Sequence, residues 1–199
     1  MQHRNSMLLI VILAVFIHGC REVSVPRPRG HFRIDLPQKN YTTFTGRESS
    51  SDNLPFTFDY PAFGKLSFEE EFENEKGWFN IEFPAYKAKL YLTYMDINHD
   101  FDELMEQTYK MNVKNHVSKA DAISEKYFND DKNKVYGVLY DLRGNTATAV
   151  QFYMTDSTRH FLRGSLYFAS APDADSLEPV VGYFREDIVH LIETLRWKQ

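Results

Sequence analysis

Alternating apolar and polar residues run through most of the chain after residue 30, and this is the spacing of half-buried β-strands. The runs that predict strands are His31–Leu36, Phe56–Tyr60, Gly64–Phe72, Trp78–Phe83, Lys89–Met95, Val135–Leu142, Ala147–Met154 and Phe161–Phe168. Two stretches lack the pattern: residues 40–53 are polar and predict a surface loop, and residues 119–133 are mixed and predict no defined element. The sequence therefore predicts a protein rich in β-structure.

Two segments change to helical spacing. Residues 98–117 place apolar side chains three and four positions apart, with charged residues between them. In the last segment Asp175 or Ser176 can cap a helix, and Pro179 fits its first turn. The clearest apolar stripe of the chain follows, and consists of Leu177, Val181, Phe184, Ile188, Leu191, Ile192 and Leu195. Such a stripe predicts the core-facing side of a packed helix.

The order of these elements predicts the fold class. Several strands come first, then a helix, three more strands and a final helix. Short connections favour an antiparallel sheet, and helices in two separate places favour an α+β fold in which helices cover that sheet. The length fits one globular domain, which we place at residues 31–199. Burial alone must stabilise this domain, because Cys20 is the only cysteine of the chain.

The N-terminal residues have the organisation of a lipoprotein export signal. Leu8–Ile17 is an apolar run of ten residues, and Gly19 precedes Cys20. A run of that length is shorter than the roughly 20 residues of a bilayer span and fits a signal peptide. We predict that residues 1–19 are removed and that Cys20 is acylated, with residues 20–30 as a flexible tether. The alternative is an uncleaved anchor helix that ends at a buried Cys20.

The charge of the chain argues against one class of partner. The net charge is −5, and loss of the signal peptide removes a single cation, Arg4. An acidic domain without a basic cluster is not expected to bind nucleic acid. We expect no cofactor either, because the sequence has neither a glycine-rich phosphate loop nor a paired-cysteine zinc motif.

One polar segment contains the residue types of a catalytic triad. Asp156, Ser157, His160 and Arg163 lie in and just after the connection between two predicted strands, whereas HExxH and GxSxG motifs are absent from the sequence. A triad needs its base within hydrogen-bond distance of the hydroxyl. Asp and Ser also shape turns, and Arg163 can pair with a carboxylate on a neighbouring strand. We therefore expect a turn here and no enzyme, and keep a catalytic site as the alternative.

A second polar cluster opens the predicted helix at 98–117. Its members are His99, Asp100, Asp102 and Glu103. Acidic residues in a first helical turn are favoured by the helix dipole, and Asp100 with Glu103 matches a capping box. A metal site would need further ligands from elsewhere, such as His31 or His116. We expect capping and no metal.

Five long segments carry a resemblance to a known family. They are PRPRGHFRIDLP (26–37), WFNIEFPAYKAKLYLTY (78–94), VYGVLYDLRGNTAT (135–148), QFYMTDSTRHFLRGSLYF (151–168) and DIVHLIETLRWK (187–198). In this order they extend over essentially the whole chain after the signal peptide, and the chain resembles the gliding-motility lipoprotein GldD family of the Bacteroidota. The order of helices and strands also resembles the Mog1/PsbP-like α/β/α sandwich, in which helices cover a twisted antiparallel sheet.

The family resemblance implies a lipid-anchored protein of the cell envelope that is required for gliding motility and acts with the gliding machinery and the type IX secretion system. It brings no catalytic residue, and the one position that it assigns is the acylated Cys20. We expect a non-enzymatic component that binds other envelope proteins or supports their assembly. Two alternatives stay open: an envelope enzyme that acts on cell-wall or glycan material, and a carrier of a small ligand.

The residues directly after Cys20 indicate the side of the membrane. The segment REVS (21–24) lacks the dense acidic run that surface-exported lipoproteins of this phylum tend to carry there. We therefore expect the domain to face the periplasm, anchored in either the inner or the outer membrane.

Overall fold

The computed structural model describes residues 34–48, 53–68, 77–144, 146–169 and 174–198, without the side chains of 174–177. The predicted signal peptide, the predicted acylation site Cys20 and the predicted tether lie outside the described residues. So do residues 31–33, and the strand predicted at His31–Leu36 can therefore be compared with the structure only from residue 34 onward.

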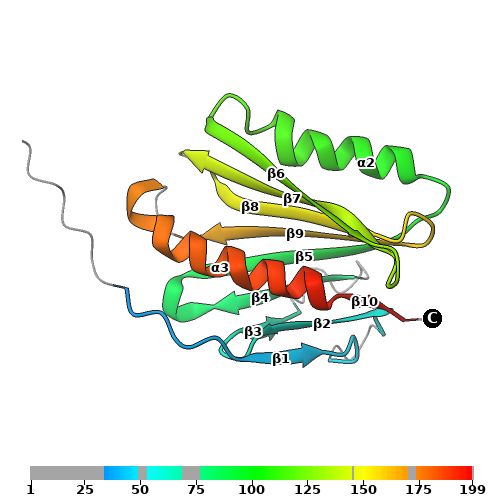
Figure 1. Cartoon of the computed structure of the whole chain (residues 1–199), viewed down its shortest axis with the longest axis horizontal. Coiled ribbons are helices and arrows are strands. Elements are labelled where there is room, and N and C mark those ends of the chain that lie inside the picture. Colours follow the sequence, from blue (N-terminus) through cyan, green and yellow to red (C-terminus); the bar gives the residue numbers. More distant parts are fainter. Residues whose placement is uncertain (1–33, 49–52, 69–76, 145, 170–173, 199) are drawn as a thin grey trace, which may run out of the picture. The chain divides into compact units, whose positions relative to one another are not determined.

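Seven strands of the described chain form the main sheet, and every neighbouring pair is antiparallel (Figure 1). In spatial order they are β3 (Lys65–Ser67), β4 (Trp78–Phe83), β5 (Ala88–Asp96), β9 (His160–Phe168), β8 (Thr148–Thr155), β7 (Val135–Gly144) and β6 (Ala120–Asp130). Tight connections pair most consecutive strands, as the sequence predicts. The pairing of β5 with β9 is the exception, since it joins segments far apart in the sequence.

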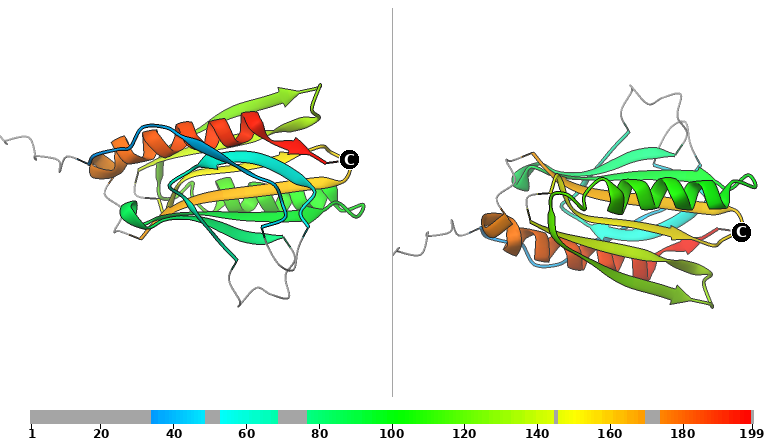
Figure 2. Two further views of the ribbon diagram at one scale, coloured as in Figure 1. Left: turned by 90° about the horizontal axis from the view of Figure 1, so that it is seen from below. Right: turned by 90° about the horizontal axis from the view of Figure 1, so that it is seen from above.

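One face of the main sheet packs against a second layer. This layer contains α3 (Ala174–Thr194) and a small antiparallel sheet of the described strands β1 (Tyr41–Phe44), β2 (Phe56–Pro61) and β10 (Arg196–Trp197) (Figures 1 and 2). The principal core lies between the layers and is rich in fully buried aromatic rings, namely Phe44, Phe56, Phe58, Phe79, Phe152 and Phe184. Each such ring contributes about 2–3 kcal/mol through burial.

The opposite face is covered only in part. Helix α2 (Phe101–Tyr109) continues into the π-helical turn η3 (Lys110–Lys114), and Leu104 of α2 packs into a second apolar cluster with residues of β7, β8 and β9. In Figure 1, α2 lies over the β6, β7 and β8 side of the sheet. The two helices therefore cover opposite faces of an antiparallel sheet, and the predicted α+β fold is confirmed.

Three strands were missed in the sequence: β1, β6 and the two-residue β10. β1 lies inside the predicted loop 40–53 and β6 inside the featureless segment 119–133. β1 is four residues long and pairs with a strand on one side only, β2. β6 is an edge strand whose side chains are mostly exposed on both faces, so it carries no alternating pattern. Pairing with β7 through ten residue pairs specifies β6 instead.

Two details of the helix ends were also wrong. Asp100 makes no side-chain capping bond to α2; its Oδ1 accepts a hydrogen bond from the backbone N–H of Asn98 at 2.7 Å. Helix α3 begins at Ala174, earlier than predicted, and therefore Pro179 lies inside the helix instead of in its first turn. Its missing N–H leaves one backbone hydrogen bond of the helix unmade.

Residues 34–40 form no strand, which corrects the prediction for His31–Leu36. Side chains, and not a neighbouring strand, hold this segment against α3. Tyr183 donates a hydrogen bond to the carbonyl of Pro37 at 3.0 Å. Lys39 Nζ lies 2.8 Å from Asp187 Oδ1 and 3.9 Å from the centre of the Tyr183 ring. The described chain thus begins with a segment that is fastened to α3.

Candidate functional site

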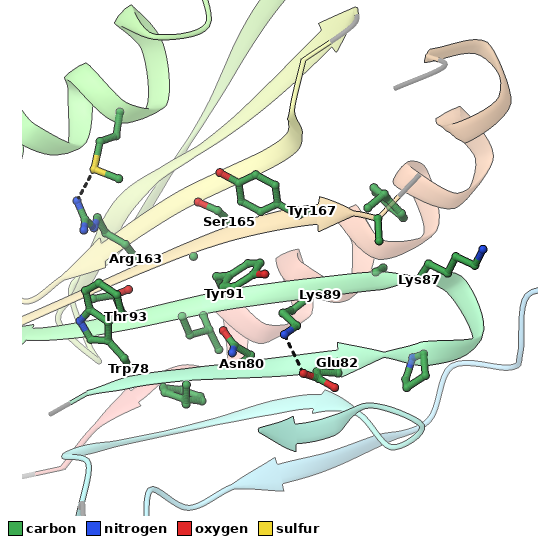
Figure 3. Close-up of a pocket in the computed structure, with 18 of the residues that line it drawn as sticks. Trp78, Asn80, Glu82, Lys87, Lys89, Tyr91, Thr93, Arg163, Ser165 and Tyr167 are labelled. Carbon is green, nitrogen blue, oxygen red and sulfur yellow. Dashed lines mark hydrogen bonds and ion pairs between the residues drawn. The ribbon is translucent and has the colours of Figure 1, made fainter. Parts of the chain in front are cut away.

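The part of the sheet that no described helix covers carries a groove of about 860 Å³ (Figure 3). Strands β4, β5 and β9 form its floor, and Met111 and Asn112 of η3 border it. Register aligns the outward side chains in three cross-strand rungs. The rungs are Trp78, Thr93 and Arg163; Asn80, Tyr91 and Ser165; and Glu82, Lys89 and Tyr167.

Strand alternation explains why these side chains point outward. On β4 the apolar residues Phe79, Ile81 and Phe83 are buried in the core, so the residues between them face the groove. The same alternation holds on β5, where Leu90 and Leu92 are buried. The groove is therefore a direct product of the strand pattern and of the limited reach of α2.

Aromatic rings dominate the exposed surface of the groove. Trp78, Tyr91 and Tyr167 keep 38%, 41% and 38% of their surface exposed. Tyr91 and Tyr167 make an edge-to-face contact with ring centres 5.4 Å apart, which holds both rings in place. Trp, Tyr and Arg are the residues that contribute most to protein binding interfaces. All three types occur in this groove.

The charged side chains of the groove are paired unevenly. Lys89 and Glu82 form an ion pair at 2.9 Å. Arg163, in contrast, contacts only the sulfur of Met111 at 3.1 Å, and no carboxylate of the described chain lies within ion-pair distance of it. Burial lowers the pKa of Arg163, although a guanidinium stays charged at any physiological pH.

Asn112 is the other unusual polar group of the groove. It is 4% exposed, and its Nδ2 has no hydrogen-bond partner in the described structure. It lies in η3, where the backbone N–H of Asn115 bonds to the carbonyl of Lys110, five residues earlier. Such π-helical turns are rare and occur frequently at functional sites. Buried donors without a partner are uncommon in folded proteins and call for an explanation.

The predicted polar cluster at 156–163 is not assembled into a triad. Asp156 shapes the turn between β8 and β9: its Oδ1 accepts hydrogen bonds from the backbone N–H groups of Thr158, Arg159 and His160 at 2.7–2.9 Å. These bonds lower the pKa of Asp156 against the effect of its burial. Ser157 is exposed, and in the described structure no hydrogen bond joins it to His160.

His160 and Arg163 of that cluster point to opposite faces of β9. Arg163 faces the groove, whereas His160 is 5% exposed and its ring stacks on Trp197 at 5.1 Å. His160 Nδ1 lies 2.8 Å from the hydroxyl of Tyr94, which also lies 2.6 Å from Asp96. Burial lowers the pKa of His160, which favours the neutral imidazole. The His160 side chain is therefore packed inside the domain, against Trp197 and Tyr94, and does not face the groove.

The second polar cluster, around His99, receives no further metal ligand from the described part of the chain. Among the described residues, no three His, Cys, Asp or Glu side chains lie close enough together to hold a metal ion. Of the two distant histidines considered with it, His116 is hydrogen-bonded to Gln151 of β8 at 3.0 Å, and His31 lies outside the described residues. Burial lowers the pKa of His116, as it does for His160.

Comparison with protein families identifies the chain. The family described as "Gliding motility lipoprotein GldD" matches residues 21–197, which is most of the chain. The chain belongs to the GldD family. As a member of a lipoprotein family it is a lipid-anchored protein of the cell envelope. Cys20 directly precedes the matched region, and its acylation stays a prediction.

Comparison with curated proteins gave no match. Among solved structures, this GldD family member is similar to cyanobacterial PsbP (CyanoP) from Synechocystis sp. PCC 6803, with 9% identity and a TM-score of 0.47. The similarity covers 83% of this chain and 97% of that one. In the described part of the chain, no helix is long and apolar enough to span a membrane.

The sequence predicted Arg163 as a site residue but grouped it with Asp156, Ser157 and His160, which do not line the groove. The groove residues Tyr91, Tyr167 and Asn112 were missed. One signal was present: in the strands at 78–83, 89–95 and 161–168 several of the outward positions hold large aromatic or charged residues. Which strands lie side by side cannot be read from that pattern, because the pairing of β5 with β9 spans more than sixty residues of sequence.

Proposed function

We propose that this GldD family member is a non-enzymatic, periplasm-facing component of the gliding and type IX secretion machinery. Its acylated Cys20 tethers it to the membrane, and it binds another envelope protein through the groove of β4, β5 and β9. The observation that carries the proposal is the groove itself, with the exposed rings of Trp78, Tyr91 and Tyr167 beside Arg163. Aromatic and arginine side chains that cluster on an open surface are typical of binding sites.

Tethering fits this role. A lipid anchor confines the domain to one membrane surface and raises its effective concentration toward partners in that membrane. The segment at 34–40 supports this view, because Lys39 and Tyr183 fasten the start of the described domain to α3. A pull on the tether would thus act on the longest helix of the described chain and not on the groove.

Site-specific photocrosslinking tests the proposal. A benzoyl-phenylalanine replaces Tyr91 in the groove or, as a control, Tyr127 on β6, which is 72% exposed. Cells that glide are irradiated, and the crosslinked products are identified by mass spectrometry. We expect a discrete product with an envelope protein of the machinery from position 91 and none from position 127. Identical products from both positions, or none from position 91, would refute the use of the groove.

Surface variants test whether the groove is needed for gliding and secretion. Tyr91→Glu with Tyr167→Glu places charges in the groove, and we expect colony spreading and protein secretion to fall while membrane-bound protein stays at the wild-type amount. Tyr127→Glu is the matched control and should leave both unchanged. Normal spreading by the double groove variant would contradict the proposal.

A small-ligand carrier is the second candidate, because a groove of about 860 Å³ lies in the size range of small-molecule sites. Native mass spectrometry of the purified protein would detect a bound small molecule. The enzyme alternative is tested by Asp156→Ala, Ser157→Ala, His160→Ala and Arg163→Ala in turn, and only the first three separate it from the proposal, because Arg163 also lines the groove. We expect Ser157→Ala, whose side chain is exposed, to support full gliding.

A further inference from the structure

Arg163 is a cation without an anionic partner in the described structure. It is partly buried on the floor of the groove, and its only hydrogen bond in the described structure goes to the thioether of Met111. A thioether is a weak acceptor, so most donors of the guanidinium are unused by the protein. Burial has already removed part of the water that would solvate the charge, as the lowered pKa of Arg163 indicates. A bound anion would restore those interactions.

Asn112 provides a second and independent donor in the lining of the same groove. It follows Met111 in the chain, it lines the same groove, and its unpartnered Nδ2 is buried. The lining of one groove thus contains two donor groups, a guanidinium and an amide, whose hydrogen-bonding capacity the described structure leaves largely unused. Convergent donors of this kind are the usual partners of a carboxylate, which accepts several hydrogen bonds at once.

The charge around the groove favours an anion as well. The described residues that line it include the cations Lys87, Lys89 and Arg163 but a single acid, Glu82, which is paired with Lys89. This excess of positive charge is notable in a chain whose net charge is −5. Charge complementarity therefore selects a negatively charged ligand at this surface.

The remaining polar residues that line the groove favour a peptide over an acyl chain as the ligand. The hydroxyls of Thr93 and Ser165 lie on the floor between the aromatic rings (Figure 3). A hydrocarbon chain would cover these hydroxyls without hydrogen-bonding them, whereas peptide amides can pair with them. Three rungs two residues apart span about 13 Å, the length of about four extended residues. The groove therefore has the length and the polarity of a short extended peptide.

We infer that the groove binds a short extended peptide segment of a partner protein through a carboxylate that Arg163 and Asn112 hold. Tyr91 and Tyr167 pack against the apolar side chains that follow the carboxylate. This inference rests on the proposed function and specifies the chemistry of the partner. The carboxylate is either a C-terminus or an acidic side chain.

Fluorescence polarisation with defined peptides tests the inference. The probes are labelled pentapeptides with Leu, Phe, Tyr or Val at the apolar positions, each made in three forms: free C-terminus, amidated C-terminus, and amidated with one internal Glu. The receptor is the full chain, purified in detergent. We expect at least one carboxylate form to bind about tenfold or more tightly than its neutral counterpart, since a hydrogen bond to a charged group has that strength. The better of the two carboxylate forms identifies the source.

Variants assign the carboxylate to its donors. Arg163→Gln should weaken the binding of carboxylate peptides about tenfold or more, and Arg163→Lys, which keeps the charge but loses the fork of donors, should retain part of it. Asn112→Asp replaces the free donor by an acceptor and should weaken binding similarly. Arg143→Gln, at an exposed arginine of β7, is the matched control and should bind as the wild type does.

The inference is overturned if no peptide binds up to about 1 mM, or if neutral and carboxylate forms bind equally well. Unchanged binding by a folded Arg163→Gln variant would overturn it as well. The photocrosslinking experiment distinguishes a wrong peptide chemistry from a wrong proposed function. If position 91 still crosslinks to an envelope protein, the groove is a binding site with a different chemistry. If it does not, the proposed function itself is wrong.

Discussion

The contact between Lys39 and Asp187 allows a sharp prediction about what fastens the start of the domain to α3. The Asp187 side chain is 4% exposed and that of Lys39 27%, and Nζ and Oδ1 are 2.8 Å apart. At an effective dielectric constant of about 20 the gross attraction is about 6 kcal/mol. Desolvation offsets much of it, and water reaches Lys39, so we expect Lys39→Met to lower the free energy of unfolding by about 2–3 kcal/mol.

The loss arises because the variant leaves a buried carboxylate with one remaining hydrogen-bond donor, the hydroxyl of Tyr41 at 2.9 Å. Asp187 Oδ2 has no partner in the described structure. For a protein of this size about 2–3 kcal/mol corresponds to a fall in melting temperature of about 5–10 °C. Thermal unfolding followed by circular dichroism, together with urea unfolding, measures both quantities.

The effect should depend on pH with a defined sign. Burial raises the pKa of Asp187 above its ordinary value, although Lys39 and Tyr41 act in the opposite direction. The folded protein therefore binds this proton more tightly than the unfolded chain does, and stability decreases as pH rises from the ordinary carboxyl pKa through the raised one. Without Lys39 the raised pKa rises further, so Lys39→Met should lose more stability at about pH 8 than at about pH 5.

Two control variants test whether the unpaired charge of Asp187 causes the loss of stability. Lys132→Met changes an exposed lysine and should stay within about 0.5 kcal/mol of the wild type. The double variant Lys39→Met with Asp187→Leu removes both charges and should recover most of the loss. A single Lys39→Met variant as stable as the wild type, or a double variant no better than the single one, would show that the buried charge does not determine this effect.

Three further predictions concern packing, protonation and anchoring. Gly164→Ala should lower the free energy of unfolding by about 1–3 kcal/mol, because a Cβ at this position would lie 2.2 Å from the ring of Phe152. Gly182→Ala in α3 places a Cβ that meets nothing within 4 Å and should raise the free energy of unfolding by about 0.5–1 kcal/mol. Urea unfolding curves of the two variants measure both changes, and equal effects would contradict the packing argument. Burial lowers the pKa of His160, so stability should fall as pH drops below the ordinary histidine value, and His160→Phe should flatten this part of the pH profile; an unchanged slope would show that another group titrates. Cys20→Ala should abolish acylation, and the protein should leave the membrane fraction; an unchanged mass of the mature chain and unchanged membrane retention would contradict lipidation at this residue.

Much of the fold follows from local patterns. The strands at 56–60, 78–83, 89–95, 135–142, 147–154 and 161–168 and both helices were predicted within a few residues, because their alternating or helical spacing records directly which side faces the core. The failures share a physical cause. β1 and β6 have little buried surface, and long-range pairing with a neighbour specifies them instead of their own pattern.

The candidate site was predicted less well than the fold. Asp156 and Ser157 were expected to form a turn, and the structure shows that turn. Arg163 was singled out together with His160, yet the two side chains occupy opposite faces of one strand, as odd and even positions must. No local signal connects Arg163 with Asn112, because a π-helical turn about fifty residues earlier brings that amide to the groove.

The sequence by itself determined the family resemblance, the α+β class and the inward or outward direction of most strand residues, and it predicts the lipoprotein signal around Cys20. The direction of a strand residue can be read locally because it depends on neighbours within a few positions. Only the tertiary structure decided which outward residues share a surface. The register of β4, β5 and β9 places Trp78, Tyr91 and Tyr167 on one open face, and the position of α2 leaves that face uncovered. Strand order and helix docking are properties of the whole folded chain, and the groove exists only at that level.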